Sequence, residues 1–210
     1  MSSKKNQSDL NISGLSPLVL NLLSPQSAKN SPAKNAAVLE AINENAKKLI
    51  AGYDKWKLCE NKGVNSLNEI HKLRETSRKS NEPKSFTGFE VHCEQLKAIE
   101  SMLESIVKEV AIIQSQIDTS LSIQRTMSTS NEDPLLQQLI TIQKFLNRLK
   151  ELYDKDLSIK KTVIQSISHT SSSVESHVLI TSWYCQLESN EISRLIVQLK
   201  ISPADCRWDL

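Results

Sequence analysis

The chain has 210 residues, of which 39% are hydrophobic, only 4% are aromatic and four are glycines. Sandwiches, barrels and doubly wound α/β folds need turn glycines and strands rich in aromatic or β-branched residues, so this composition disfavours them and favours long helices. The net charge of +2 does not by itself indicate a nucleic-acid or membrane partner. The cysteines are widely spaced without a CxxC pair and no signal peptide is evident, so we expect a soluble intracellular protein with reduced thiols.

Residues 1–34 lack aromatic side chains and are rich in Ser, Asn and Lys, which predicts a disordered Ser-Pro tail. An apolar segment between Leu15 and Leu23 interrupts this tail. It is either a short docking motif or a segment without a role.

Serine precedes proline at three positions in this tail and at one near the C-terminal end of the sequence. The candidate phosphorylation sites are therefore Ser31, Ser24, Ser16 and Ser202. Ser31 has proline at +1 and Lys34 at +3, which is the full preference of a cyclin-dependent kinase. The alternative is that Ser-Pro pairs merely reflect the composition of disordered tails.

Helical periodicity begins in residues 35–75, which we interpret as an N-terminal helical hairpin. Its first helix, near 36–60, has apolar residues at coiled-coil spacing, namely Leu39, Ile42, Ala46, Leu49, Tyr53 and Trp56. Gly63 is predicted to stop this helix, and the capping box from Ser66 to Glu69 is predicted to start a second helix near 66–76. Residues 76–88 follow as a basic linker that contains Pro83.

The strongest pattern predicts a long antiparallel coiled coil over residues 89–169, with helices near 89–126 and 134–168. The first helix repeats apolar residues at spacings of three and four, at Leu96, Ile99, Leu103, Ile106, Val110, Ile113 and Ile117. The second opens on Asp133 as N-cap and Pro134 as first helical residue, and its apolar positions include Tyr153, Ile159 and Val163.

Residues 170–210 are predicted to form the C-terminal helices and tail. A capping box from Ser172 to Glu175 starts a helix near 174–188, and another helix follows near 190–200. The fold expected for the whole chain is an all-α, elongated helical bundle.

The sequence contains no P-loop, Gly-rich nucleotide loop or HExxH motif, so we predict no catalytic, cofactor or metal site. His169, His177 and Cys185 match no familiar zinc spacing. Charged pairs with the acid four residues before the base are typical of solvated helices rather than catalytic dyads. They are Glu44/Lys48, Glu104/Lys108, Glu151/Lys155 and Asp156/Lys160.

The block ELYDKDLSIKKTVIQSISHT, residues 151–170, mixes charges and a tyrosine in a way that a generic coiled coil does not require. It resembles the C-terminal block of the cyclin-dependent kinase 2-interacting protein family at Glu151, Tyr153, Lys155, Asp156, Leu157, Lys160, Lys161, Thr162, Val163, His169 and Thr170. Trp56, Asn61 and Gly63 look like the Trp-containing first helix of that family and its Gly stop. The Trp183 helix and the segment with Glu191, Arg194 and Leu195 look similar too, so that the resemblance covers residues 45–200.

The resemblance implies a non-enzymatic adaptor that binds cyclin-dependent kinase, the replication-initiating kinase and an AAA-type ATPase complex. It implies roles in DNA replication, the DNA damage checkpoint and ribosome maturation, in the nucleus with the cytoplasm as a second location. No direct nucleic-acid or membrane partner is expected, and self-association stays open. The candidate partner contacts are Tyr153, Lys155, Lys160, Lys161, His169, Trp56 and Trp183.

Two alternatives stay open at this point. The first concerns the class of protein, because heptads also suit a structural coiled-coil subunit of a kinetochore, tethering or cytoskeletal complex. The second concerns the aromatic candidates. Tyr153 continues the apolar spacing of its helix and could be a seam residue, and tryptophans at helical spacing are more often core than contact.

Overall fold

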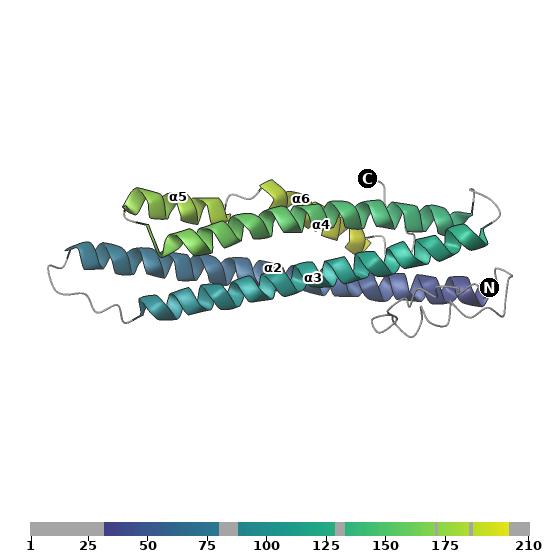
Figure 1. Cartoon of the computed structure of the whole chain (residues 1–210), viewed down its shortest axis with the longest axis horizontal. Helices are drawn as coiled ribbons and strands as arrows, with labels where there is room; N and C mark the ends of the chain where they lie inside the picture. Colours follow the sequence, from purple (N-terminus) through teal and green to yellow (C-terminus); the bar gives the residue numbers. More distant parts are fainter. Residues whose placement is uncertain (1–31, 80–87, 129–132, 171, 185–186, 202–210) are drawn as a thin grey trace, which may run out of the picture.

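A computed structural model describes residues 32–79, 88–128, 133–170, 172–184 and 187–201. They form the helices α2 (Pro32–Lys79), α3 (Phe89–Met127), α4 (Pro134–Ile167), α5 (Ser173–Tyr184) and α6 (Leu187–Ile201), and these described residues include no β-strand (Figure 1). The predicted all-α, elongated bundle is confirmed. In this part of the chain, none of the helices combines the length and the apolar character that a membrane span requires. The predicted disordered tail, up to residue 31, lies outside the described residues.

Helices α3 and α4 form the predicted antiparallel hairpin. Three side-chain pairs join them, Glu104 with Lys161, Asp118 with Gln143, and Gln124 with Asp133. The residue number rises on α3 as it falls on α4, which defines the antiparallel register. The predicted seam of α3 is buried at all seven positions from Leu96 to Ile117, with at most 6% of each side chain exposed.

Both N-terminal caps predicted around α4 and α5 are confirmed. The Leu135 backbone N–H donates to Asp133 Oδ1 at 3.0 Å, and Pro134 is the first helical residue. At α5, the Glu175 backbone N–H donates to Ser172 Oγ at 3.1 Å and the Ser172 N–H donates to Glu175 Oε2 at 3.2 Å. These side chains satisfy backbone donors that the first turn of a helix leaves free.

The predicted N-terminal hairpin is wrong, because α2 is one continuous helix through Gly63 and Ser66. A glycine inside a helix costs only about 1 kcal/mol, which tertiary packing can outweigh. Ser66 caps no helix; its hydroxyl donates to Gln95 Oε1 on α3 at 3.0 Å. The predicted linker is therefore shorter, since α2 ends at Lys79 and α3 begins at Phe89, with residues 80–87 outside the description.

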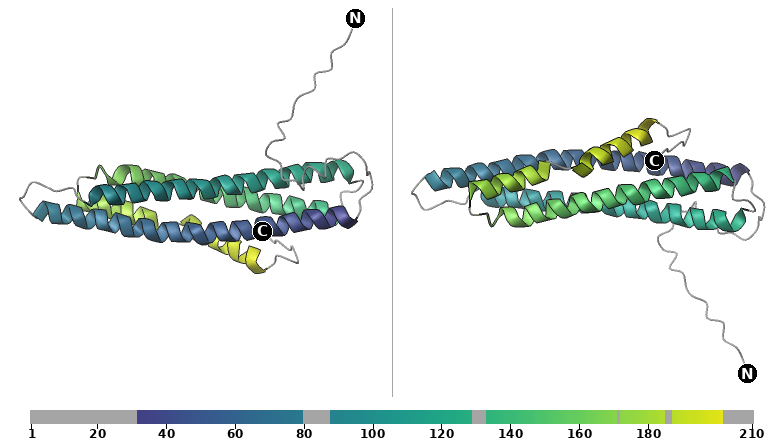
Figure 2. Two further views of the ribbon diagram at one scale, coloured as in Figure 1. Left: turned by 90° about the horizontal axis from the view of Figure 1, so that it is seen from below. Right: turned by 90° about the horizontal axis from the view of Figure 1, so that it is seen from above.

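The remaining helices complete an up-down-up-down bundle. The pair Asn45–Gln116 joins α2 to α3, and Trp56 on α2 meets Asp156 on α4. Helices α5 and α6 each contact both α2 and α4. Figure 2 shows them following one another along the bundle, so together they occupy the position of a fourth helix.

Candidate functional site

Four of the predicted contact residues lie together in the core rather than on the surface. Trp56 comes from α2, Tyr153 and Lys160 from α4, and Trp183 from α5, and each has at most 1% of its side chain exposed. With Glu60, Gly63 and Asp156 they form what we call the tryptophan–lysine cluster. The expectation that these four side chains face a partner is therefore corrected, because none of them is accessible in the folded chain.

Lys160 is at the centre of this cluster. Its ammonium Nζ lies 2.7 Å from Asp156 Oδ1 and 3.2 Å from Glu60 Oε1. The same ammonium lies 5.6 Å from the ring centroid of Trp56 and 5.2 Å from that of Trp183, within the range of cation–π attraction. A fully buried cation is tolerated only when it is paired and hydrogen-bonded, and here the partners come from three helices.

The two carboxylates of the cluster share the indole N–H of Trp56. Nε1 donates to Asp156 Oδ2 at 3.0 Å and to Glu60 Oε1 at 3.2 Å. Lys57 Nζ, nearer the surface, pairs with Glu60 Oε2 at 2.6 Å. Two cations thus balance two carboxylates. Burial raises the pKa of Asp156, and the pairing with Lys160 opposes that shift.

Trp183 explains why position 63 is a glycine. A Cβ built on Gly63 would lie 2.1 Å from Trp183 Cζ2, so the indole lies directly against the backbone of α2. The Trp183 indole N–H donates to the Glu60 carbonyl oxygen at 3.1 Å. Gly63 therefore allows α5 to approach α2, and it does not end the helix.

Tyr153 packs against this cluster as a seam residue. Its ring is edge-on to Trp56, with centroids 4.6 Å apart. Burial raises the pKa of Tyr153, and its hydroxyl has no hydrogen-bond partner among the described residues. The alternative interpretation, a core residue, is the correct one.

A second junction, at the other end of α5, is made by Arg74 of α2. Its guanidinium donates to the carbonyl oxygens of Ser168 at 2.7 Å and Thr170 at 2.9 Å, and also to the Thr170 hydroxyl. It lies 5.1 Å from the ring centroid of Phe89. Arg74 thus binds the carbonyl groups after α4, where a cation is favourable. Thr170, one of the residues of the resemblance, is held there by this arginine.

Two histidines face each other where α5 lies against α2. The rings of His71 and His177 are edge-on with centroids 4.4 Å apart. Burial, followed by the neighbouring His177, lowers the pKa of His71. The described residues contain no group of three or more His, Cys, Asp or Glu side chains suited to a metal ion.

A third junction ties α6 to α4. Arg148 donates from Nε and Nη2 to the two carboxylate oxygens of Glu191, at 2.8 and 2.7 Å. These hydrogen bonds lower the pKa of Glu191. Such a bidentate pair fixes orientation as well as distance.

The other three predicted contact residues lie on the surface of α4 and the turn after it. Lys155 pairs with Glu151 at 2.7 Å, Lys161 reaches Glu104 on α3 at 2.5 Å, and His169 is exposed. Two of the predicted helical pairs form, and two acids choose other partners, since Glu44 pairs with Lys47 and Glu104 with Lys161. The candidate phosphorylation sites Ser16, Ser24, Ser31 and Ser202 lie outside the described residues.

Sequence reasoning missed the interior role of Asp156 and Lys160, although a signal was present. Counting in steps of three and four from Leu149 leads through Tyr153 to Asp156, Lys160, Val163 and Ile167, and all are buried. The two charged residues therefore occupy seam positions, whereas Ile159, which was predicted there, is only partly buried. Comparison of the chain with protein-family models and with curated proteins finds no match.

Proposed function

We propose that this protein is a non-enzymatic adaptor of the cyclin-dependent kinase 2-interacting protein type, with kinase and AAA-type ATPase partners in DNA replication and ribosome maturation. One observation carries the proposal. The residues behind the resemblance are scattered from Trp56 to Glu191, yet most of them meet at the three junctions just described.

That convergence supports the resemblance for a physical reason. A chance match of short blocks would place its residues without regard to one another in the fold. Here Trp56, Gly63, Asp156, Lys160 and Trp183 depend on each other, because each supplies a charge, a donor or a space that another uses. A set of this kind defines one bundle geometry, which is what members of a family share.

The alternative, a structural coiled-coil subunit, is less well supported. A rod subunit uses its apolar seam to pair with another chain. The seam of α3 is instead closed within the chain by α4, and that of α4 by α2 and α5. Partners must therefore bind the outer faces, where Lys155, Lys161 and His169 lie.

Affinity purification from cells at native expression level, read by mass spectrometry, tests this proposal. We expect a cyclin-dependent kinase, the replication-initiating kinase and AAA-type ATPases to co-purify with the wild-type chain. Lys161→Glu and Lys155→Glu, on the surface, should reduce one of these partners at unchanged melting temperature. Recovery of kinetochore, tethering or cytoskeletal subunits without the kinases or the ATPases would support the structural alternative instead.

A further inference from the structure

The side of α5 that faces away from the bundle is apolar. Val174, Val178 and Tyr184 are 73%, 57% and 73% exposed, and with Thr181 they follow the helical spacing of one stripe. The opposite side of the same helix carries Trp183, which is buried in the tryptophan–lysine cluster. A helix that is apolar on both sides is normally covered on both sides. We call the exposed stripe the outer face of α5.

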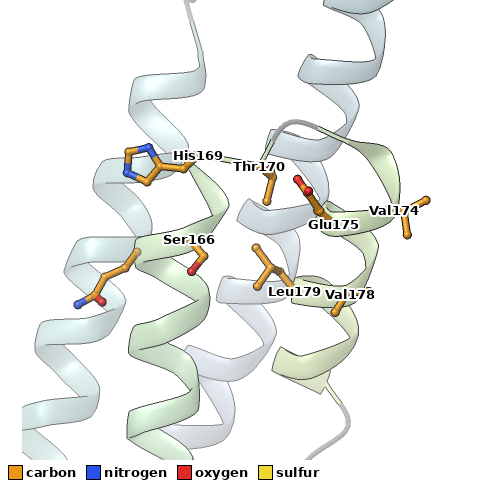
Figure 3. A pocket seen from close by; sticks show the side chains of 8 residues that line it. Ser166, His169, Thr170, Val174, Glu175, Val178 and Leu179 are labelled. Atoms are coloured by element: carbon orange, nitrogen blue, oxygen red, sulfur yellow. The ribbon is translucent and has the colours of Figure 1, made fainter.

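A groove runs beside this face, between α5 and the end of α4. It has a volume of about 520 Å³ and is lined by Gln165, Ser166, His169, Thr170, Val174, Glu175, Val178 and Leu179. Figure 3 shows Leu179 directed from α5 towards α4, with Ser166 and His169 along the opposite wall. A volume of this size accepts a few side chains of a bound segment rather than a whole helix bundle.

The size of the face argues against its pairing with the same face of another copy. Helix α5 has 12 residues, which makes it about 18 Å long. A stable interface buries roughly 800 Å² on each partner, more than two stripes of this length provide. The expected occupant is therefore a short extended or helical segment with several apolar anchors.

The chain itself carries such a segment outside the described residues. It contains Leu15, Leu18, Val19, Leu20, Leu22 and Leu23, and no charged residue occurs from Leu10 to Ala28. An uncharged apolar segment matches a groove whose floor is apolar and whose rim is mostly polar without net charge. We propose that residues 15–23 of one copy of this chain dock on the outer face of α5 of a second copy.

The length of the chain excludes docking within one copy. Helix α2 begins at Pro32, and its His71 contacts His177 of α5, so the two points are separated by 39 residues of helix, or about 58 Å. Leu23 precedes Pro32 by nine residues, which span about 32 Å when fully extended. The apolar segment cannot reach the α5 of its own chain, but it can reach that of a neighbouring antiparallel copy.

Binding of a labelled synthetic peptide of residues 13–27 to the full chain, followed by fluorescence anisotropy, tests the first half of this proposal. We expect saturable binding that weakens at least tenfold in Val178→Asp and is unchanged in Ile112→Asp. Ile112 is a matched control because it is also 57% exposed, but on α3. Both variants should keep the wild-type circular dichroism. A peptide that fails to bind the wild type, or that binds Val178→Asp equally well, overturns the proposal.

Sedimentation velocity of mixed variants tests whether the segment acts between copies. Val178→Asp destroys the face and leaves the segment intact, whereas Leu22→Asp does the reverse. We expect the wild type to associate with rising concentration, each variant alone to stay monomeric, and an equimolar mixture to form a dimer joined by one contact. A mixture that stays monomeric, or single variants that associate like the wild type, would rule out docking between copies.

Discussion

Along α3, every seam position from Leu96 to Ile117 is aliphatic, whereas the seam of α4 changes to Tyr153, Asp156 and Lys160 where α2 and α5 join it. The first region is stabilised by burial of apolar area, which has no preferred direction. The second is stabilised by an ion pair, indole N–H donors and a close approach at Gly63, all of which need one geometry.

The difference shows that the two regions contribute differently to the bundle. Aliphatic seams stabilise association but accept more than one register and partner. A buried polar group at a seam position restricts the register, because any other alignment leaves it unpaired. In this protein the α3–α4 seam supplies stability, and the tryptophan–lysine cluster determines where α2 and α5 dock.

The largest effect should come from a charge in the aliphatic seam. In Leu103→Asp, a carboxylate replaces a side chain with 0% exposure on the longest apolar stripe, and no cation is present at that seam position. The desolvation of an unpaired charge costs several kcal/mol, so thermal unfolding followed by circular dichroism should show partial or complete loss of the fold. Ile112→Asp, on the exposed side of the same helix, should melt within a few degrees of the wild type. Equal melting temperatures for Leu103→Asp and the wild type would refute the seam.

The next largest effect should come from the centre of the cluster. Lys160→Ala leaves Asp156 and part of Glu60 without their buried cation, which should lower the free energy of unfolding by about 3–5 kcal/mol. Its neighbour Lys161, which is 36% exposed in its pair with Glu104, is the control. Lys161→Ala should cost less than about 1 kcal/mol. Urea titration measures both, and similar losses for the two lysines would contradict the buried assignment of Lys160.

Glycine-to-alanine substitutions should have opposite signs at two positions of α2. At Gly52 the added Cβ would meet Ile106 Cγ2 at 3.6 Å, an ordinary contact, so Gly52→Ala should stabilise by up to about 1 kcal/mol. At Gly63 the same Cβ would overlap Trp183, so Gly63→Ala should destabilise by about 1–3 kcal/mol. In a Trp183→Ala background the second penalty should disappear. Stabilisation by Gly63→Ala in the wild-type chain would mean that Trp183 does not pack there.

The smallest effect should come from Tyr153→Phe. Because the buried hydroxyl has no hydrogen-bond partner in the described structure, its removal should leave stability at pH 7 unchanged or raise it by up to about 1 kcal/mol. Burial raises the pKa of Tyr153, so the neutral phenol is favoured by folding. Its contribution is present below the unfolded pKa of about 10 and is lost as the pH rises above that value. Chemical denaturation at pH 7 and pH 11 should therefore show a smaller alkaline loss for the variant than for the wild type.

What the sequence predicted well is what depends on neighbours along the chain. The spacing of Leu96 to Ile117, the N-cap at Asp133 and the reciprocal cap at Ser172 are all local, and each appears in the structure as predicted. Gly63 was misjudged because its meaning depends on Trp183, far away in the sequence. Asp156 and Lys160 were judged as a surface pair because charge usually marks a solvated face, and only the partners on α2 and α5 make them interior.

The sequence separations within the cluster also bear on how the chain folds. Trp56 and Asp156 are 100 residues apart and Trp183 and Glu60 are 123 apart, whereas Gln124 and Asp133 at the end of the α3–α4 hairpin are separated by nine. Closing long loops costs more entropy before any contact forms, so the α3–α4 hairpin is the natural nucleus and the cluster closes late. The reverse order applies to local opening, in which α5 and α6 detach as one cooperative unit while α3 and α4 stay paired.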